Sequence, residues 1–139
     1  ALRGGAKTKD ATKESLFCAL HVAVLLRRPL AAAALLSAGA TANAKTKEDD
    51  TALHLAARCG DAEMTEMLIQ AGANLNFKNK PAGYTPLHWA AYRGHPGVAG
   101  ALLRAKANTK LKDAEGRTAL EAAQHAGHSE VVVALGGKP

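Results

Sequence analysis

The sequence predicts an all-α fold, a solenoid of stacked antiparallel helix pairs from which hairpin-like fingers project. One sequence motif occurs twice with few changes. The first copy, TALHLAARCGD, begins at Thr51 and the second copy, TPLHWAAYRGH, begins at Thr85, so their spacing is 85 − 51 = 34 residues. A second apolar run and then a polar, turn-rich stretch follow each copy, as in AEMTEMLIQAGA and NLNFKNKPAGY. Short helical units repeated at a fixed period bury their apolar faces by stacking on one another.

Two further copies extend the period along the chain. TALEAAQHAGH begins at Thr118, where 118 − 85 = 33, and the more divergent CALHVAVLLRR begins at Cys18, where 51 − 18 = 33. We therefore expect one domain over residues 1–139, with four repeats at about 15–47, 48–80, 82–114 and 115–137. Residues 1–14 contain GGAKTKD and are expected to form part of a preceding finger or a flexible lead.

The first helix of each unit has a start signal and a stop signal. The threonine that opens the line is expected to cap the free N–H groups, and Pro86 suits a first helical turn. Gly60, Gly94 and Gly127 are expected to end these helices in the left-handed conformation. His95 and His128 follow two of these glycines and are expected to cap the second helix.

The second helix of each unit has apolar residues at helical spacing and ends at a small-residue turn. Two units depart from the pattern, since Arg27 stands where Gly60 stands one repeat later, and Lys106 replaces the glycine found at Gly72. A side chain in a left-handed turn costs about 1 kcal/mol. Gly97 adds helix-breaking character in the third unit, whose second helix is expected to be the least stable inner segment.

Composition restricts the class of partner and the cellular setting. The 139 residues carry a formal net charge of +6, which favours an acidic partner or a polyanion. Only two cysteines are present, so no disulfide framework is expected and an intracellular location is predicted. The longest apolar stretch, LFCALHVAVLL at 16–26, is too short to span a bilayer. The absence of an initiating Met indicates a piece of a longer protein.

The repeated line T-P-L-H-x-A-A-x-x-G-H, with its apolar run and G-A-x-x-N, resembles the ankyrin repeat over roughly positions 15–137. The resemblance implies a curved helical solenoid and a binding scaffold that contacts proteins along its concave side, with no cofactor. It also implies that Asn43 and Asn76, at the finger position that is asparagine in the family, are candidates for asparaginyl hydroxylation. The alternative is that each asparagine forms hydrogen bonds within its own finger.

Catalytic and metal chemistry are not predicted. His21, His54 and His88 occupy one position in successive repeats, about one repeat apart, whereas zinc ligands must lie about 2 Å from the metal. The resemblance implies instead that each imidazole bridges the repeat threonine and neighbouring backbone. No base is identifiable beside Cys59, and no glycine-rich phosphate loop is present. We predict no enzyme activity.

The positions that the repeat leaves free are the finger tips and one face of each first helix. They hold four of the five aromatic residues and many cations, and aromatic residues and arginine are enriched at interface hot spots. Asn79 is expected to be exposed with them. The predicted partner-binding residues are Trp89, Tyr92, Arg93, Phe77, Lys78, Lys80, Tyr84, Leu55, Arg58, Lys45, Lys47, Lys110, Lys112 and Arg117.

The leading hypothesis is a monomeric, non-catalytic scaffold that binds a partly acidic protein or extended peptide. A nucleic-acid binder, suggested by the finger lysines, is the first alternative, but no recognised reading motif is present and Asp49, Asp50, Asp113 and Glu115 interrupt the basic residues. The second alternative is a structural spacer within a larger protein.

Overall fold

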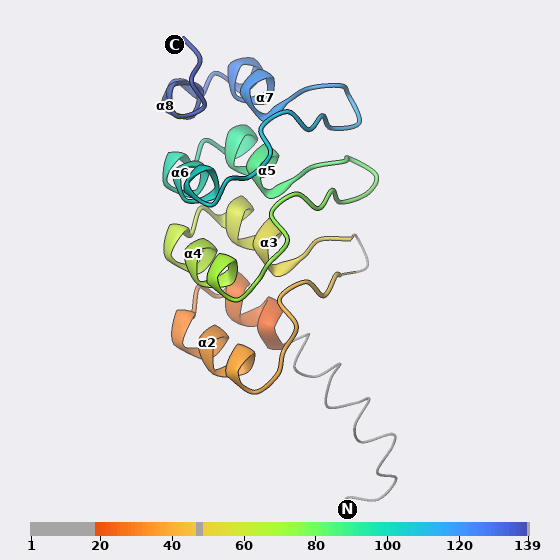
Figure 1. Ribbon diagram of the computed structural model, residues 1–139, viewed down its shortest axis with the longest axis vertical. Coiled ribbons are helices and arrows are strands. Elements are labelled where there is room, and N and C mark those ends of the chain that lie inside the picture. The colour runs from red at the N-terminus through yellow and green to blue at the C-terminus, as the bar shows by residue number, and fades with distance from the viewer. Residues whose placement is uncertain (1–18, 47–48, 139) are drawn as a thin grey trace, which may run out of the picture.

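A computed structural model describes residues 19–46 and 49–138 of the chain (Figure 1). These residues form helices and no strand, so the predicted all-α class is confirmed. Residues 19–25 are helical, and the helices that follow are α2 (Pro29–Ser37), α3 (Ala52–Cys59), α4 (Ala62–Gln70), α5 (Pro86–Arg93), α6 (Pro96–Arg104), α7 (Ala119–Ala126) and α8 (Ser129–Ala134). The predictions for residues 1–14, Cys18 and Lys47 lie outside the described residues.

The helices stack in two columns. The first helices of successive units, α3, α5 and α7, pack side by side, and the second helices α4, α6 and α8 form the other column. Figure 1 shows the connecting segments projecting as fingers on the side away from the α4–α6–α8 column. The inner helices therefore lie between the outer helices and the fingers.

Threonine caps start the inner helices, as the sequence predicted. The side chains of Thr51, Thr85 and Thr118 accept hydrogen bonds from the backbone N–H three residues later, and each bond has a reciprocal partner. That reciprocal partner is a histidine in α3 and α5 and Glu121 in α7. Two otherwise unpaired N–H groups are satisfied at each helix start.

The helix ends use the left-handed conformation at every predicted position. Gly60, Gly94 and Gly127 have φ between 72° and 79°. Arg27 and Lys106 adopt φ of 57° and 71° despite their side chains, which confirms that they occupy glycine-type turns. Each of these two residues therefore contributes local strain of about 1 kcal/mol.

The core is built from small aliphatic side chains. Alanines fill the space between the two columns, and the largest fully buried apolar side chains are Leu20, Leu53, Met64, Leu68, Leu87 and Leu102. Such a core depends on close approach of the helices, because small side chains leave little bulk to fill gaps.

In each finger, a backbone hydrogen bond spans the turn. The N–H groups of Thr46 and Asp113 donate to carbonyls four residues later, at 2.8 and 2.9 Å, whereas the N–H of Asn79 donates to Tyr84, five residues later, at 2.9 Å. The extra residue of the 34-residue spacing therefore lies inside the second finger. Pairing of strand type is limited to one bridge, between Lys45 and Thr51, among the described residues.

Candidate functional site

The finger face is the surface formed by the three fingers and the adjoining side of α3, α5 and α7. Hydrogen bonds between fingers hold its parts in place. The side-chain amide of Asn79 donates to Asp50 Oδ1 in the preceding finger at 2.8 Å, and the N–H of Ala114 donates to the carbonyl of Ala82 at 2.9 Å. Positions on neighbouring fingers therefore keep a defined spacing.

Three aromatic side chains form a cluster at the centre of the finger face. Tyr84 contacts Trp89 edge to face and Tyr92 at a tilt, with ring centroids 5.1 Å apart in both pairs. The guanidinium groups of Arg58 and Arg93 each lie over the Trp89 ring at 5.5 Å from its centroid. The Trp89 indole nitrogen is buried and has no hydrogen-bond acceptor among the described residues. The structure brings these predicted residues together, and their role in binding a partner stays a prediction.

Asp113 connects the aromatic cluster to the third finger. Its carboxylate accepts a hydrogen bond from the Tyr92 hydroxyl at 2.7 Å and from the backbone N–H groups of Glu115 and Arg117 at 2.9 and 3.0 Å. Burial acts to raise the pKa of Asp113, but these hydrogen bonds prevail and hold it below its ordinary value. Burial raises the pKa of the Tyr92 hydroxyl, which therefore stays a donor at neutral pH.

Most cations of the finger face are exposed, whereas Arg58 and Arg117 are half-buried. Lys45 lies over the Phe77 ring at 4.1 Å from its centroid. No salt bridge among the described residues involves the finger-face cations Arg58, Arg93, Lys45, Lys78, Lys80, Lys110 or Lys112. Arg117 is the exception, paired with Glu115 at 3.6 Å. Across residues 19–46 and 49–138, most cations of the finger face therefore have no ion-pair partner.

Two residues expected to be exposed are buried. Leu55 is 4% exposed and belongs to the core cluster, against which Trp89, at the same position one repeat later, is packed. Asn79 is 5% exposed because its side chain is used for the contact with Asp50 and also accepts from the N–H of Tyr84. Neither side chain is therefore presented at the surface of the finger face.

Two of the repeat histidines, His54 and His88, are structural bridges, as the resemblance implied. His54 Nδ1 accepts from the N–H of Thr51, and His54 Nε2 lies 2.9 Å from the carbonyl oxygen of Tyr84 in the next finger. His88 makes the equivalent bridge from Thr85 to the carbonyl of Arg117 at 2.8 Å. Burial lowers the pKa of both histidines, so the neutral ring is favoured. No group of three or more potential metal ligands occurs in the described part of the chain.

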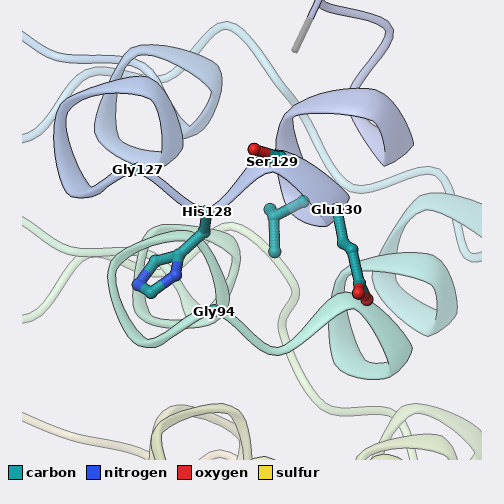
Figure 2. A pocket seen from close by; sticks show the side chains of 6 residues that line it. Gly94, Gly127, His128, Ser129 and Glu130 are labelled. Atoms are coloured by element: carbon teal, nitrogen blue, oxygen red, sulfur yellow. The ribbon is translucent and has the colours of Figure 1, made fainter.

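His95 and His128 are the N-cap residues of α6 and α8, as the sequence predicted. Neither side chain makes a capping hydrogen bond. Instead, His95 Nε2 lies 3.1 Å from the carbonyl oxygen of Arg58, and His128 Nε2 lies 3.0 Å from that of Tyr92, each one repeat earlier. Figure 2 shows the His128 side chain extending from the α7–α8 link toward the turn at Gly94. A glycine–histidine pair recurring in register was the signal for this contact.

Asn43 and Asn76 also bridge repeats rather than bonding only within their own fingers, which corrects that alternative. Asn43 Oδ1 accepts from the N–H of Asn74 at 2.6 Å, and Asn43 Nδ2 donates to the carbonyl of Gly72. Asn76 Oδ1 accepts from the N–H of Asn108 at 2.8 Å. Both asparagines are exposed, and their hydroxylation stays a prediction.

Comparison with known proteins supports the family assignment. The family model for ankyrin repeats (3 copies) matches residues 20–113 and 72–138, which together cover most of the chain. The chain belongs to the ankyrin-repeat family, whose repeats generally serve as non-catalytic modules of protein–protein interaction.

Three proteins that are similar to this chain are considerably longer than it. Protein PhlB of Serratia liquefaciens is 38% identical over 104 residues, which cover 75% of this chain and 46% of that protein. Tyrosine-protein kinase Shark of Drosophila melanogaster is 32% identical over 130 residues, covering 94% of this chain and 14% of the kinase. Rabankyrin-5 of Mus musculus is 31% identical over 151 residues, covering 86% of this chain and 13% of that protein. The chain thus spans less than half the length of each.

Across residues 19–46 and 49–138, no helix has the length and apolar character needed to cross a membrane.

Proposed function

We propose that this ankyrin-repeat chain is a non-catalytic interaction module, and that its finger face binds a partly acidic protein segment. The observation that carries the proposal is the unpaired charge around the aromatic cluster. Three acidic groups of the fingers are already engaged, because Asp50 accepts from Asn79, Asp113 accepts from Tyr92, and Glu115 pairs with Arg117. A partner's carboxylates supply the missing counter-charges. We place this activity inside the cell, since two cysteines do not form a disulfide framework.

The two kinds of residue have different roles in this proposal. Exposed lysines act through a field screened within about 8 Å at physiological salt, so they accelerate association more than they tighten the complex. Aromatic side chains in the middle of an interface slow dissociation because they are desolvated on binding. Trp89 and Tyr92 are half-buried already, so little conformational entropy remains to be lost when a partner covers them.

The first experiment locates the interface. A photo-crosslinking amino acid is placed at Lys80 on the second finger or at Gln70 on α4, both exposed, and the protein is incubated with lysate, with and without nuclease treatment. We expect a specific protein adduct from position 80 that excess unlabelled protein competes away, and no such adduct from position 70. An adduct that disappears with nuclease would indicate a nucleic-acid binder. An adduct only from position 70 would move the interface to the outer helices.

Charge reversal on the finger tests the steering role with the captured partner. We expect Lys78→Glu with Lys80→Glu to slow association and to flatten its salt dependence, while dissociation and the melting temperature stay near those of the parent. Lys138→Glu, also exposed but near the end of the described chain, is the control and should leave association nearly unchanged. Stopped-flow or biosensor kinetics at several salt concentrations measure both. Equal slowing by the two variants would show a general charge effect.

Tyr92 tests the anchoring role. Tyr92→Ala should speed dissociation, with a loss of about 1–3 kcal/mol in binding free energy. Tyr92→Phe keeps the ring and removes only the hydrogen bond to Asp113, so it should affect stability more than binding. If Tyr92→Phe weakens binding as much as Tyr92→Ala, the residue acts by positioning the third finger and not by contacting the partner.

A further inference from the structure

We infer that the finger face binds an extended segment of polyproline II type that carries an acidic side chain at every third residue, one for each of Lys45, Lys78 and Lys112. The inference rests on the proposed function, because it specifies the conformation and the charge spacing of the protein segment bound there.

The three lysines occupy the same position in three consecutive fingers. Each directly precedes the residue whose backbone N–H closes the finger, namely Thr46, Asn79 or Asp113. Of these closing residues, Asn79 and Asp113 are 5% and 6% exposed and Thr46 is half-buried, whereas the three lysines are all exposed. The alternation of an extended backbone places the closing side chain inward and the lysine outward. The result is a ladder of cations with one rung per repeat.

The rungs have a defined separation because the fingers are tied to one another. The side-chain bond from Asn79 to Asp50 joins the first and second fingers, and the backbone bond from Ala114 to Ala82 joins the second and third. Lys45 is further held against Phe77 of the second finger. The fingers follow the packing of α3, α5 and α7, and packed helices lie about 8–10 Å apart.

This pitch selects one partner conformation. A polyproline II segment rises about 3.1 Å per residue and has three residues per turn, so every third side chain lies on one face at intervals of roughly 9 Å. A β-strand rises about 3.3 Å per residue, but its side chains alternate faces, so residues three apart point in opposite directions. An α-helix rises about 1.5 Å per residue, so about six residues cover the distance between two lysines. Residues six apart do not share a face, because the helix has about 3.6 residues per turn. Only the polyproline II geometry matches both the distance and the direction.

The aromatic cluster favours a protein segment over a nucleic acid. Single-stranded nucleic acids bind by stacking bases on open aromatic faces. Tyr84 contacts the Trp89 and Tyr92 rings, and two guanidinium groups already lie over Trp89. The rings therefore offer side contacts to a narrow chain and not free platforms for bases.

The lysines should not contribute equally. Lys112 lies near Glu121 at the start of α7, and its charge is among the smaller causes that keep the pKa of Glu121 low, behind the hydrogen bonds from Thr118. Lys78 stands on the middle finger, between Lys45 and Lys112. We expect Lys78 to be the most sensitive position of the ladder and Lys112 the least.

The test uses three synthetic peptides of equal charge, each with three glutamates and otherwise proline. The glutamates stand at every second, every third or every fourth residue, and binding is followed by fluorescence anisotropy at low salt. Each exposed pair contributes roughly a two- to five-fold gain in affinity. We expect the every-third peptide to bind at least about five-fold more tightly than the other two, and Lys78→Glu to abolish this preference. Lys138→Glu, with the same charge change elsewhere, should preserve it.

Equal affinity for the three peptides would overturn the inference, because a diffuse positive surface does not distinguish spacing. Tighter binding of a ten-nucleotide single-stranded DNA than of the every-third peptide would also overturn it. These failures are separable from failure of the proposed function. If crosslinking at position 80 still captures a protein while the peptides bind equally, the finger face remains the interface and only the charge spacing is wrong.

Discussion

The same position between neighbouring repeats is occupied in two different ways. In the two glycine–histidine junctions, Gly60 faces His95 and Gly94 faces His128, each histidine reaching a carbonyl oxygen of the preceding repeat. The arginine–aspartate junction stands one repeat earlier, where Arg27 Nε lies 3.7 Å from Asp61 Oδ2.

The two kinds of junction depend on different physics. A Cβ added at Gly60 or Gly94 would lie 2.6 Å from Nδ1 of the facing histidine, so the close approach requires a residue without a side chain. The Arg27 side chain is 59% exposed, and exposed ion pairs contribute only about 0–1 kcal/mol. The first repeat is therefore joined less tightly. It also exposes apolar surface, since Leu26 and Leu30 are 62% and 86% exposed.

The largest effect should come from filling a glycine–histidine junction. Gly94→Ala introduces strain at φ 72° and a clash with His128, and we expect it to lower the free energy of unfolding by about 2–3 kcal/mol. Gly127→Ala is the matched control, because Gly127 has φ 79° but open space around it. It should cost only about 1 kcal/mol of strain. Urea denaturation of both variants measures the difference.

Equal losses in the two alanine variants would show that backbone strain, and not the facing histidine, determines the effect. His128→Ala added to Gly94→Ala supplies a further check, since removing the ring should restore part of the lost stability. If the double variant is no more stable than Gly94→Ala, the histidine does not limit the space at this turn.

The frame of the fold could be predicted from the sequence because its signals are local. Threonine caps, helix-ending glycines and apolar spacing each act within a few residues, and they recur in register. Even the strained turns at Arg27 and Lys106 could be found, by comparison with the glycine at the same position in other repeats. Repetition thus substitutes for tertiary information.

The details of the site could not be predicted in the same way, because they depend on contacts about 30 residues apart. The sequence predicts an exposed Asn79, whereas in the structure its side chain is buried by a hydrogen bond to Asp50, 29 residues away. Leu55 likewise looked exposed, but it belongs to the core cluster against which Trp89 packs. Asp113 was not recognised as the residue that holds Tyr92, since one sequence does not show which finger meets which helix.

Acid should weaken the histidine bridges of the inner helices. Burial lowers the folded-state pKa of His21, His54 and His88 below the ordinary value of 6.5, so the unfolded chain binds protons more readily. Their stabilisation is complete above pH 6.5 and is lost as the pH falls below it. We expect the free energy of unfolding to decrease between pH 7.5 and pH 5, by denaturant titration.

A variant distinguishes these histidines from the carboxylates. His88→Gln keeps hydrogen-bonding capacity without a titrating ring, so its stability should fall less steeply between pH 7.5 and pH 5 than that of the parent. Gln124→Asn is the control, since Gln124 is exposed on α7 and does not titrate, and it should leave the slope unchanged. An unchanged slope in His88→Gln would assign the pH dependence to groups other than this bridge.

The smallest effect should come from converting one side of the arginine–aspartate junction into glycine. Arg27→Gly relieves strain of about 1 kcal/mol at φ 57°. It also removes an exposed ion pair of about 0–1 kcal/mol and makes the unfolded chain more flexible. We expect a net change within about 0.5 kcal/mol of zero, whereas Asp61→Ala should cost about 1 kcal/mol because Asp61 also caps α4 by accepting from the N–H of Met64. A loss above about 1 kcal/mol in Arg27→Gly, measured by denaturant titration, would show that the ion pair holds the first repeat as firmly as the histidines hold the others.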